Sequence, residues 1–104
     1  MIKISIIVPV FEGKDFTNSF FSFFEQFPLP SEVELIIVDN GSHNLFYSSL
    51  LSRGNKTPNC TVVKYSLKQS SYAARNYGAL QAKGSVLAFT DFDCILSKAY
   101  IDLL

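Results

Sequence analysis

The sequence predicts an α/β fold in which helices flank a parallel sheet. Near-continuous runs of β-branched residues alternate with segments of helical character, and clusters of polar residues follow several of the runs. Apolar runs that do not alternate with polar residues are typical of strands buried on both faces, as in parallel sheets. Strands that alternate with helices indicate βαβ units with right-handed crossovers. We therefore expect one Rossmann-like domain over residues 1–104, with a sheet of about four strands.

The first strand is expected at residues 4–8, because Pro9 removes a backbone donor and should end it. A helix should follow at 15–27, capped by Asp15 or Thr17. Its phenylalanines recur at spacings of three and four residues, so we interpret them as a stripe that packs in the core. The stripe consists of Phe16, Phe20, Phe23, Phe24 and Phe27.

Further strands and helices are expected along the rest of the chain. In order they are a strand at 33–38, a short helix at 43–51, a polar loop at 52–59, a strand at 60–65, a connection at 66–69, a helix from Ser70 or Ser71 to about 83, a strand at 86–90 and a helix after Ser97. Polar clusters at 9–12, 39–42 and 91–93 follow three of the strands. In open parallel sheets, ligands bind beyond the carboxyl ends of the strands. We therefore expect a binding site there.

Composition excludes several classes of protein. Nine basic and nine acidic residues give a net charge of zero, which argues against a nucleic-acid binder. Cys60 and Cys94 do not form a C-x-x-C motif, and His43 is the only histidine, so we expect reduced thiols in a cytoplasmic domain. The apolar run before Pro9 is too short for a membrane span and lacks a signal-peptide pattern. Attachment to the inner face of a membrane would require sequence outside this chain.

The Asp-x-Asp motif formed by Asp91 and Asp93 follows the fourth predicted strand directly. Carboxylate oxygens suit Mg²⁺ or Mn²⁺, and such ions are commonly shared between one or two carboxylates and substrate phosphates. Two acids in a loop are nevertheless more often solvated or engaged in capping a helix. The motif alone is a weak signal, and its context must support it.

Arg75 and Asp39 supply that context. Arg75 lies near the start of a predicted helix, where a guanidinium could hold a base or a phosphate beside the positive end of the helix dipole. Asp39 ends the second predicted strand and could accept a hydrogen bond from a nucleobase N–H. A structural ion pair for Arg75 and a turn or capping role for Asp39 remain alternatives. On the helix of Arg75, small residues recur every four positions, at Ala74, Gly78 and Ala82, which predicts close packing on the sheet.

Four ordered blocks of this chain together resemble the family 2 glycosyltransferases, and the resemblance extends over nearly the whole chain. The blocks are ISIIVPVF at 4–11, ELIIVDNGS at 34–42, ARNYG at 74–78 and AFTDFDC at 88–94. The resemblance implies a GT-A type fold and inverting transfer of a sugar from a nucleotide donor, commonly UDP-linked, to a hydroxyl of a saccharide, lipid or protein. It also implies a divalent cation, Mn²⁺ or Mg²⁺.

The resemblance assigns site residues as well. The first block would lie along the base and ribose, and Asp39 would bind the base. Arg75 would lie near the nucleotide, and the Asp-x-Asp segment would bind the nucleotide sugar and its metal, with Asp93 as the direct ligand and Asp91 beside it. The full set of expected binding residues is Pro9, Val10, Phe11, Glu12, Asp39, Arg75, Asp91, Phe92 and Asp93.

Three positions depart from the family pattern. Glu12 stands where many members have asparagine, and Asn40 stands where many have a second aspartate. Both substitutions bear on nucleotide specificity. Cys94 stands where many have a third acid, and we interpret it as a packing residue.

The family's general base lies well downstream of its Asp-x-Asp motif, so we expect it beyond Leu104. The chain would then be the N-terminal, donor-binding part of a larger domain. We expect it to be inactive alone and prone to self-association. A non-catalytic binding or scaffolding domain of the same fold is the alternative. A sugar-nucleotide pyrophosphorylase is disfavoured, because residues 10–14 carry only one glycine and one lysine.

Overall fold

The computed structural model describes residues 1–66, 70–94 and 96–104, and it confirms the predicted α/β class. The strands form a parallel sheet in the order β3-β2-β1-β4. They are β1 (Ile4–Val10), β2 (Val33–Asp39), β3 (Cys60–Lys64) and β4 (Val86–Phe89). The helices are the 3-10 turn η1 (Lys14–Phe16), α1 (Thr17–Gln26), α2 (Asn44–Asn55), α3 (Ser71–Gln81) and α4 (Lys98–Asp102). Residues 67–69 of the expected connection lie outside the described part of the chain.

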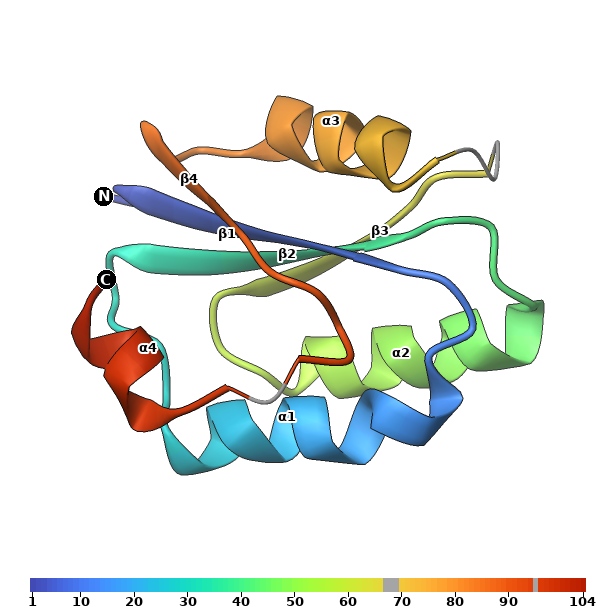
Figure 1. The fold of residues 1–104 in the computed structure, drawn as a ribbon, viewed down its shortest axis with the longest axis horizontal. Helices are drawn as coiled ribbons and strands as arrows, with labels where there is room; N and C mark the ends of the chain where they lie inside the picture. The colour runs from blue at the N-terminus through green and yellow to red at the C-terminus, as the bar shows by residue number, and fades with distance from the viewer. Residues whose placement is uncertain (67–69, 95) are drawn as a thin grey trace.

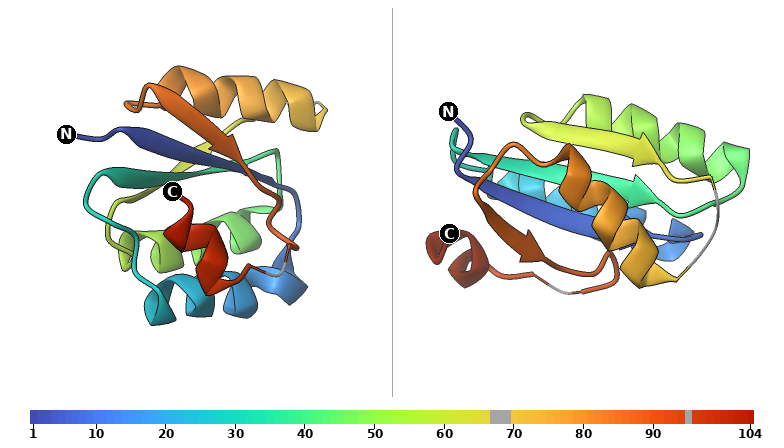
Figure 2. Two further views of the ribbon diagram at one scale, coloured as in Figure 1. Left: turned by 60° about the vertical axis from the view of Figure 1, so that its left-hand side comes forward. Right: turned by 90° about the horizontal axis from the view of Figure 1, so that it is seen from above.

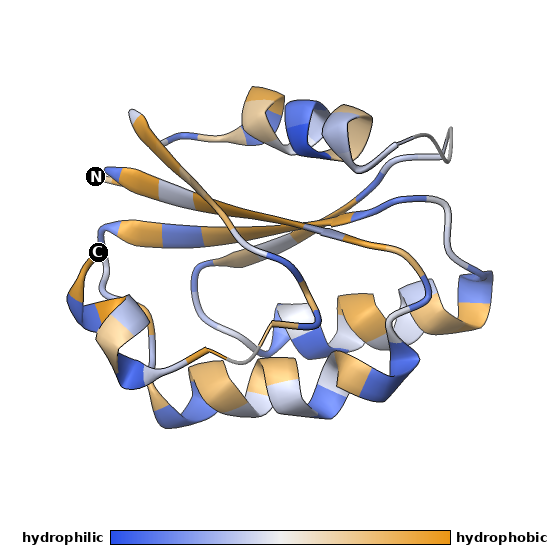
Figure 3. Ribbon diagram, in the orientation of Figure 1, coloured by the Kyte–Doolittle hydropathy of each residue, from blue (hydrophilic) through white to orange (hydrophobic). Residues whose placement is uncertain are grey.

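The sheet is the middle layer of the molecule, with α1 and α2 on one face and α3 on the other (Figure 1). The larger core fills the space between the sheet and α1 and α2, and the smaller core lies under α3. Apolar residues run along both central strands, β1 and β2 (Figure 3). This explains the near-continuous apolar runs, since a central strand buries both of its faces.

The strand order reverses at β1. The chain proceeds outward from β1 to β2 and β3, and then crosses the sheet through α3 to place β4 on the other side of β1 (Figure 2). All strands are parallel, so their carboxyl ends meet at one edge of the sheet, which we call the carboxyl edge. A gap between the loops at such a reversal is the usual binding position in open α/β sheets.

The prediction that β1 ends before Pro9 is wrong, because the strand continues to Val10. Pro9 is paired in register with Val38 of β2. The Ile7 carbonyl accepts a hydrogen bond from Thr90 N–H, just beyond β4. Every second residue of a strand directs its backbone groups toward the same neighbouring strand, so Ile7 and Pro9 face the same side. The missing N–H of Pro9 therefore faces the side where β4 has already ended, and the sheet loses no hydrogen bond there.

Helix α1 differs from the prediction in its start and in its buried face. Neither Asp15 nor Thr17 caps it, because a 3-10 turn precedes the helix and the Thr17 hydroxyl donates to the Gly13 carbonyl at 3.1 Å. Phe21 is fully buried although it was left out of the predicted stripe, and Phe16 is 45% exposed although it was included. The stripe is therefore rotated by about one residue from the spacing that the sequence suggested.

Helix α2 extends to Asn55, so the predicted loop at 52–59 is partly helical. Gly54, which we interpreted as a loop residue, is buried in the last helical turn. A Cβ at this position would come within 2.4 Å of Val62 Cγ2, so glycine lets the helix approach β3.

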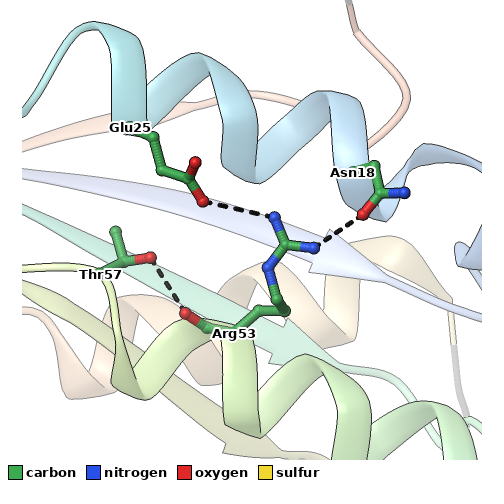
Figure 4. A network of polar contacts seen from close by, with 4 residues as sticks. All are labelled: Asn18, Glu25, Arg53 and Thr57. Carbon is green, nitrogen blue, oxygen red and sulfur yellow. Dashed lines mark hydrogen bonds and ion pairs between the residues drawn. The ribbon is translucent and has the colours of Figure 1, made fainter.

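The extra turn of α2 also positions Arg53 toward α1. Its guanidinium donates to Asn18 Oδ1 at 2.8 Å and lies 3.5 Å from Glu25 Oε1. The Thr57 hydroxyl closes the end of the helix by donating to the Arg53 carbonyl at 3.1 Å (Figure 4). These contacts tie the two helices together on one face of the sheet.

Helix α3 packs closely at two of its three predicted small residues, Ala74 and Gly78, while Ala82 lies just beyond the helix, which ends at Gln81 and not at about 83. Ala74 is fully buried, and a Cβ on Gly78 would lie 2.7 Å from Ile7 Cγ2 and 2.8 Å from Val38 Cγ2. Ser70 is the cap, since its hydroxyl accepts a bond from Ala73 N–H at 3.3 Å. Within the described residues, no helix combines the length and the apolar character needed to cross a bilayer.

Candidate functional site

A cleft of about 470 Å³ opens at the carboxyl edge, where the strand order reverses. Its walls come from the end of β1 and the segment after it, Asn40 just after β2, the first turns of α3 and the loop after β4. We call it the carboxyl-edge cleft. Its lining residues are Pro9, Val10, Phe11, Glu12, Gly13, Phe16, Asn40, Ser71, Arg75, Asp91, Phe92 and Asp93.

Eight of the nine predicted binding residues line this cleft, and Asp39 does not. Seven of them lie at the end of β1 or in the loops after β1 and β4, which are adjacent strands, and Arg75 lies in the first turns of α3. Gly13, Phe16, Asn40 and Ser71 also line the cleft but were absent from the predicted binding set, although Asn40 was expected to bear on nucleotide specificity. For Asn40 and Ser71, their positions directly after a strand and at a helix start were the available signals.

Arg75 is held in place at one side of the cleft. Its guanidinium donates to Asp91 Oδ1 at 3.0 Å and to the Ser71 hydroxyl at 3.2 Å. The Arg75 side chain is about a quarter exposed and that of Asp91 about half, so the pair faces solvent at the cleft. This pairing fixes the direction of the guanidinium and leaves donors for a ligand, because a guanidinium carries five N–H groups.

The acids after β4 form a compact cluster with Cys94. Ligand atoms of Asp91, Asp93 and Cys94 all lie within 4.8 Å of one another, and the three residues are exposed. Exposed acidic groups are common without an ion, so the cluster by itself assigns no metal. The interpretation of Cys94 as a packing residue is wrong, since the residue lies at the surface.

Asp39 is fully buried at the end of β2, beside the cleft and not within its lining. Its Oδ2 accepts a long bond from Ser42 N–H at 3.3 Å, while Oδ1 has no hydrogen-bond partner among the described residues. Burial raises the pKa of this carboxyl above its ordinary value, and bonds from Ser42 and the charge of Lys64 oppose the shift. Glu12 adds a smaller upward effect on the same pKa. A buried oxygen without a partner is a candidate acceptor for a ligand N–H.

Glu12 lines the cleft but directs its carboxylate to the loop after β2. The residue has φ 49°, in the left-handed region that favours glycine and asparagine. Its N–H donates to the Ser42 hydroxyl at 2.8 Å, and its Oε2 accepts from His43 N–H at 2.6 Å. The loops after β1 and β2 are therefore joined by two hydrogen bonds at this residue.

Phe92 is mainly a core residue, although it was predicted to bind substrate. It is 5% exposed, and its ring centroid lies 4.6 Å from that of Phe20 on α1. A Cβ on Gly13 would come within 2.6 Å of the Phe92 ring, so glycine is needed for the loop after β1 to pass over it. Phe92 thus forms the floor of the cleft and anchors the segment that carries the two aspartates.

The sheet order, the helices on both faces and the cleft at the reversal define a Rossmann-like α/β domain of the GT-A type. Residues 5–104 match the family described as glycosyl transferase family 2. The chain belongs to that family.

Relatives and solved structures agree with this assignment. The chain is 33% identical over 100 residues to glycosyltransferase AglE of Haloferax volcanii, a match that covers 95% of this chain and 33% of AglE. It resembles the crystal structure of S. aureus TarS 1–349 with a TM-score of 0.82 at 23% identity, covering 97% of this chain and 30% of that one. The structure of TarS 1–349 in complex with UDP matches with a TM-score of 0.70 at 26% identity, covering 88% and 28%. The chain therefore spans about a third of the length of these relatives.

Proposed function

We propose that the protein containing this chain is a glycosyltransferase that transfers a sugar from a UDP-linked donor to an acceptor hydroxyl with inversion. This chain supplies the donor site. The observation that carries the proposal is the assembly of Arg75 with Asp91 and Asp93 around one cleft, at the strand reversal of a family 2 chain. The related TarS has been crystallised with UDP, which supports the choice of nucleotide.

The residues of the cleft suit a nucleoside diphosphate. Pro9, Val10 and Phe11 offer an apolar and backbone wall for a base and a ribose, and Phe11 is 46% exposed. The free oxygen of Asp39 suits a ring N–H, provided that the base reaches past the lining residues to the end of β2. Arg75 would hold a phosphate through the N–H groups that Asp91 does not occupy.

The cluster after β4 fits a divalent cation that is shared with the diphosphate. Asp93 and Asp91 provide the hard oxygen donors that Mn²⁺ and Mg²⁺ prefer, and an exposed position leaves room for phosphate oxygens. One oxygen of Asp91 is already bonded to Arg75, so Asp93 is the better candidate for the direct ligand. When bound, the cation would offset the negative charge of the leaving diphosphate.

We propose that the general base lies outside this chain and that the isolated chain therefore transfers no sugar. Abstraction of the acceptor proton requires a base within about 3 Å of the hydroxyl, or one water away. After Asp93 the only acid is Asp102, and it is exposed on α4 and paired with Lys98 at 3.4 Å.

The test is calorimetry of UDP binding to the full-length protein, with and without Mn²⁺. We expect binding that Mn²⁺ strengthens, and Asp93→Ala should remove most of that enhancement because the direct ligand is lost. Asp102→Ala is the matched control, since it removes an exposed acid that lies away from the cleft. Unchanged Mn²⁺ dependence in Asp93→Ala would contradict the assigned role.

A further inference from the structure

The loop after β1 is joined to the loop after β2 by a short chain of hydrogen bonds. Glu12 accepts from His43 N–H through its side chain and donates to the Ser42 hydroxyl through its backbone. Ser42 in turn donates its N–H to Asp39 Oδ2. Ser42 is buried, and Asp39 is fully buried. Glu12 thus contacts the loop that holds the Asp39 carboxylate. The Glu12 side chain bonds to the backbone of that loop, at His43 N–H.

The backbone of Glu12 supports the same interpretation. A non-glycine residue with a positive φ is held there by its surroundings, and such residues cluster at functional sites. Here the surroundings are the two bonds to Ser42 and His43. The bond from His43 N–H to the Glu12 side chain is 2.6 Å long, and hydrogen bonds to carboxylates are generally shorter than those between neutral groups.

We propose that Glu12 is a positioning residue for Asp39: its bonds to Ser42 and His43 hold the loop after β2, and its negative charge sets the pH range over which Asp39 recognises the base. The inference rests on the proposed function of the carboxyl-edge cleft as a nucleotide-sugar site. It assigns Glu12 to the loop rather than to direct contact with the nucleotide.

The charges around Asp39 define the direction of the pH effect. Burial is the main cause that raises the pKa of Asp39, Lys64 on β3 lowers it, and Glu12 adds the smallest upward effect. The charged residue of α3 is Arg75, and its guanidinium is paired with Asp91. Asp39 must be ionised to accept a ring N–H with full strength, so UDP binding should increase as pH rises through the pKa of Asp39. Removal of the Glu12 charge should move this increase to lower pH.

Two substitutions separate the two effects of Glu12 in the full-length protein. Glu12→Gln keeps an oxygen that accepts from His43 N–H but removes the charge. We expect the midpoint of the pH dependence of UDP affinity to move to lower pH, because the nearby negative charge that disfavours ionisation of Asp39 is lost. Glu12→Ala removes the acceptor as well, and the loss of one charge-assisted hydrogen bond should weaken UDP binding about tenfold. Glu32→Gln, which removes an exposed charge at the opposite edge of the sheet, is the control.

The ligand-free protein provides a readout that does not depend on UDP. Carbon-13 NMR of the Asp39 carboxyl should show titration at lower pH in Glu12→Gln than in wild type, and the His43 amide should exchange faster in Glu12→Ala. An unchanged Asp39 titration in Glu12→Gln, or unchanged exchange in Glu12→Ala, overturns the inference. Absence of UDP binding to wild type at every pH would instead contradict the proposed function, and the NMR results would still decide the role of Glu12 toward Asp39.

Discussion

At the scale of single residues, the site depends on how each polar group is already engaged. Arg75 and Asp91 are paired, Glu12 is bonded to the backbone of its neighbouring loop, and one oxygen of Asp39 has no partner among the described residues. From the sequence, all of these were predicted as binding residues, and their different contacts in the structure now distinguish them. The paired groups are preoriented, whereas the Asp39 oxygen is buried and unpartnered among the described residues.

Replacement of Arg75 by lysine tests whether the guanidinium fork matters. Lysine keeps the positive charge but cannot donate in a fixed fork to both Asp91 and a phosphate, so UDP affinity should fall about tenfold. The free energy of unfolding should change by less than about 1 kcal/mol, because the Arg75–Asp91 pair is partly exposed to water. Calorimetry and urea unfolding of the two proteins measure these quantities. Equal loss of stability and affinity would indicate a structural role for the pair.

At the scale of elements, the close approach of α3 to the sheet positions Arg75. Ala74 and Gly78 are the buried contacts of this helix, and its C-terminal end is fixed by a buried polar network. Glu34 Oε2 accepts from Lys83 N–H at 2.7 Å and from the Ser5 hydroxyl at 2.6 Å, and that hydroxyl accepts from Gly84 N–H at 2.9 Å. These bonds connect the turn after α3 to β1 and β2.

Gly78→Ala should destabilise the fold by about 1–3 kcal/mol, the usual cost of overpacking. The new methyl group would lie within 2.8 Å of side-chain atoms of Ile7 and Val38, so the helix would have to move away from the sheet. Asn76→Ala is the matched control, because it changes an exposed residue of the same helix. Urea unfolding measures both. A Gly78→Ala variant as stable as wild type would show that α3 can shift at no cost.

At the scale of the whole molecule, β4 is an edge strand with a half-exposed apolar surface. It pairs with β1 on one side, and no described strand lies on its other side. Leu87 and Phe89 share one face of β4 and are 40% and 50% exposed. Unpaired edges with exposed apolar residues promote association between chains.

The isolated chain should therefore self-associate at micromolar concentration, and Phe89→Lys should shift it toward monomer. A lysine on an edge strand opposes pairing because its charge would have to be desolvated. Sedimentation velocity of the two forms measures the distribution of species. Ser48→Lys, an exposed position on α2, controls for the added charge alone. Monomeric wild type would contradict the prediction.

Much of the fold and the outline of the site followed from the sequence. The apolar runs at 4–8 and 33–38 indicated buried central strands, because a parallel sheet covered on both faces hides such runs from water. Strands of that kind bring the polar clusters after them to one edge, so the carboxyl-edge cleft was predictable in position and in most of its residues. The small residues of α3 likewise predicted its close packing.

Tertiary structure alone decided which side chains are buried and which atoms they meet. Local patterns did not show that Phe92 turns into the core, that Gly54 lets α2 continue against β3, or that Cys94 stays at the surface. The bond from His43 to Glu12 and the burial of Asp39 likewise depend on two loops that are about 30 residues apart in sequence. The sequence determined the strands, the helices and the edge at which the site forms. Packing between distant segments decided the chemistry of each residue there, because burial and hydrogen bonding are properties of the assembled molecule.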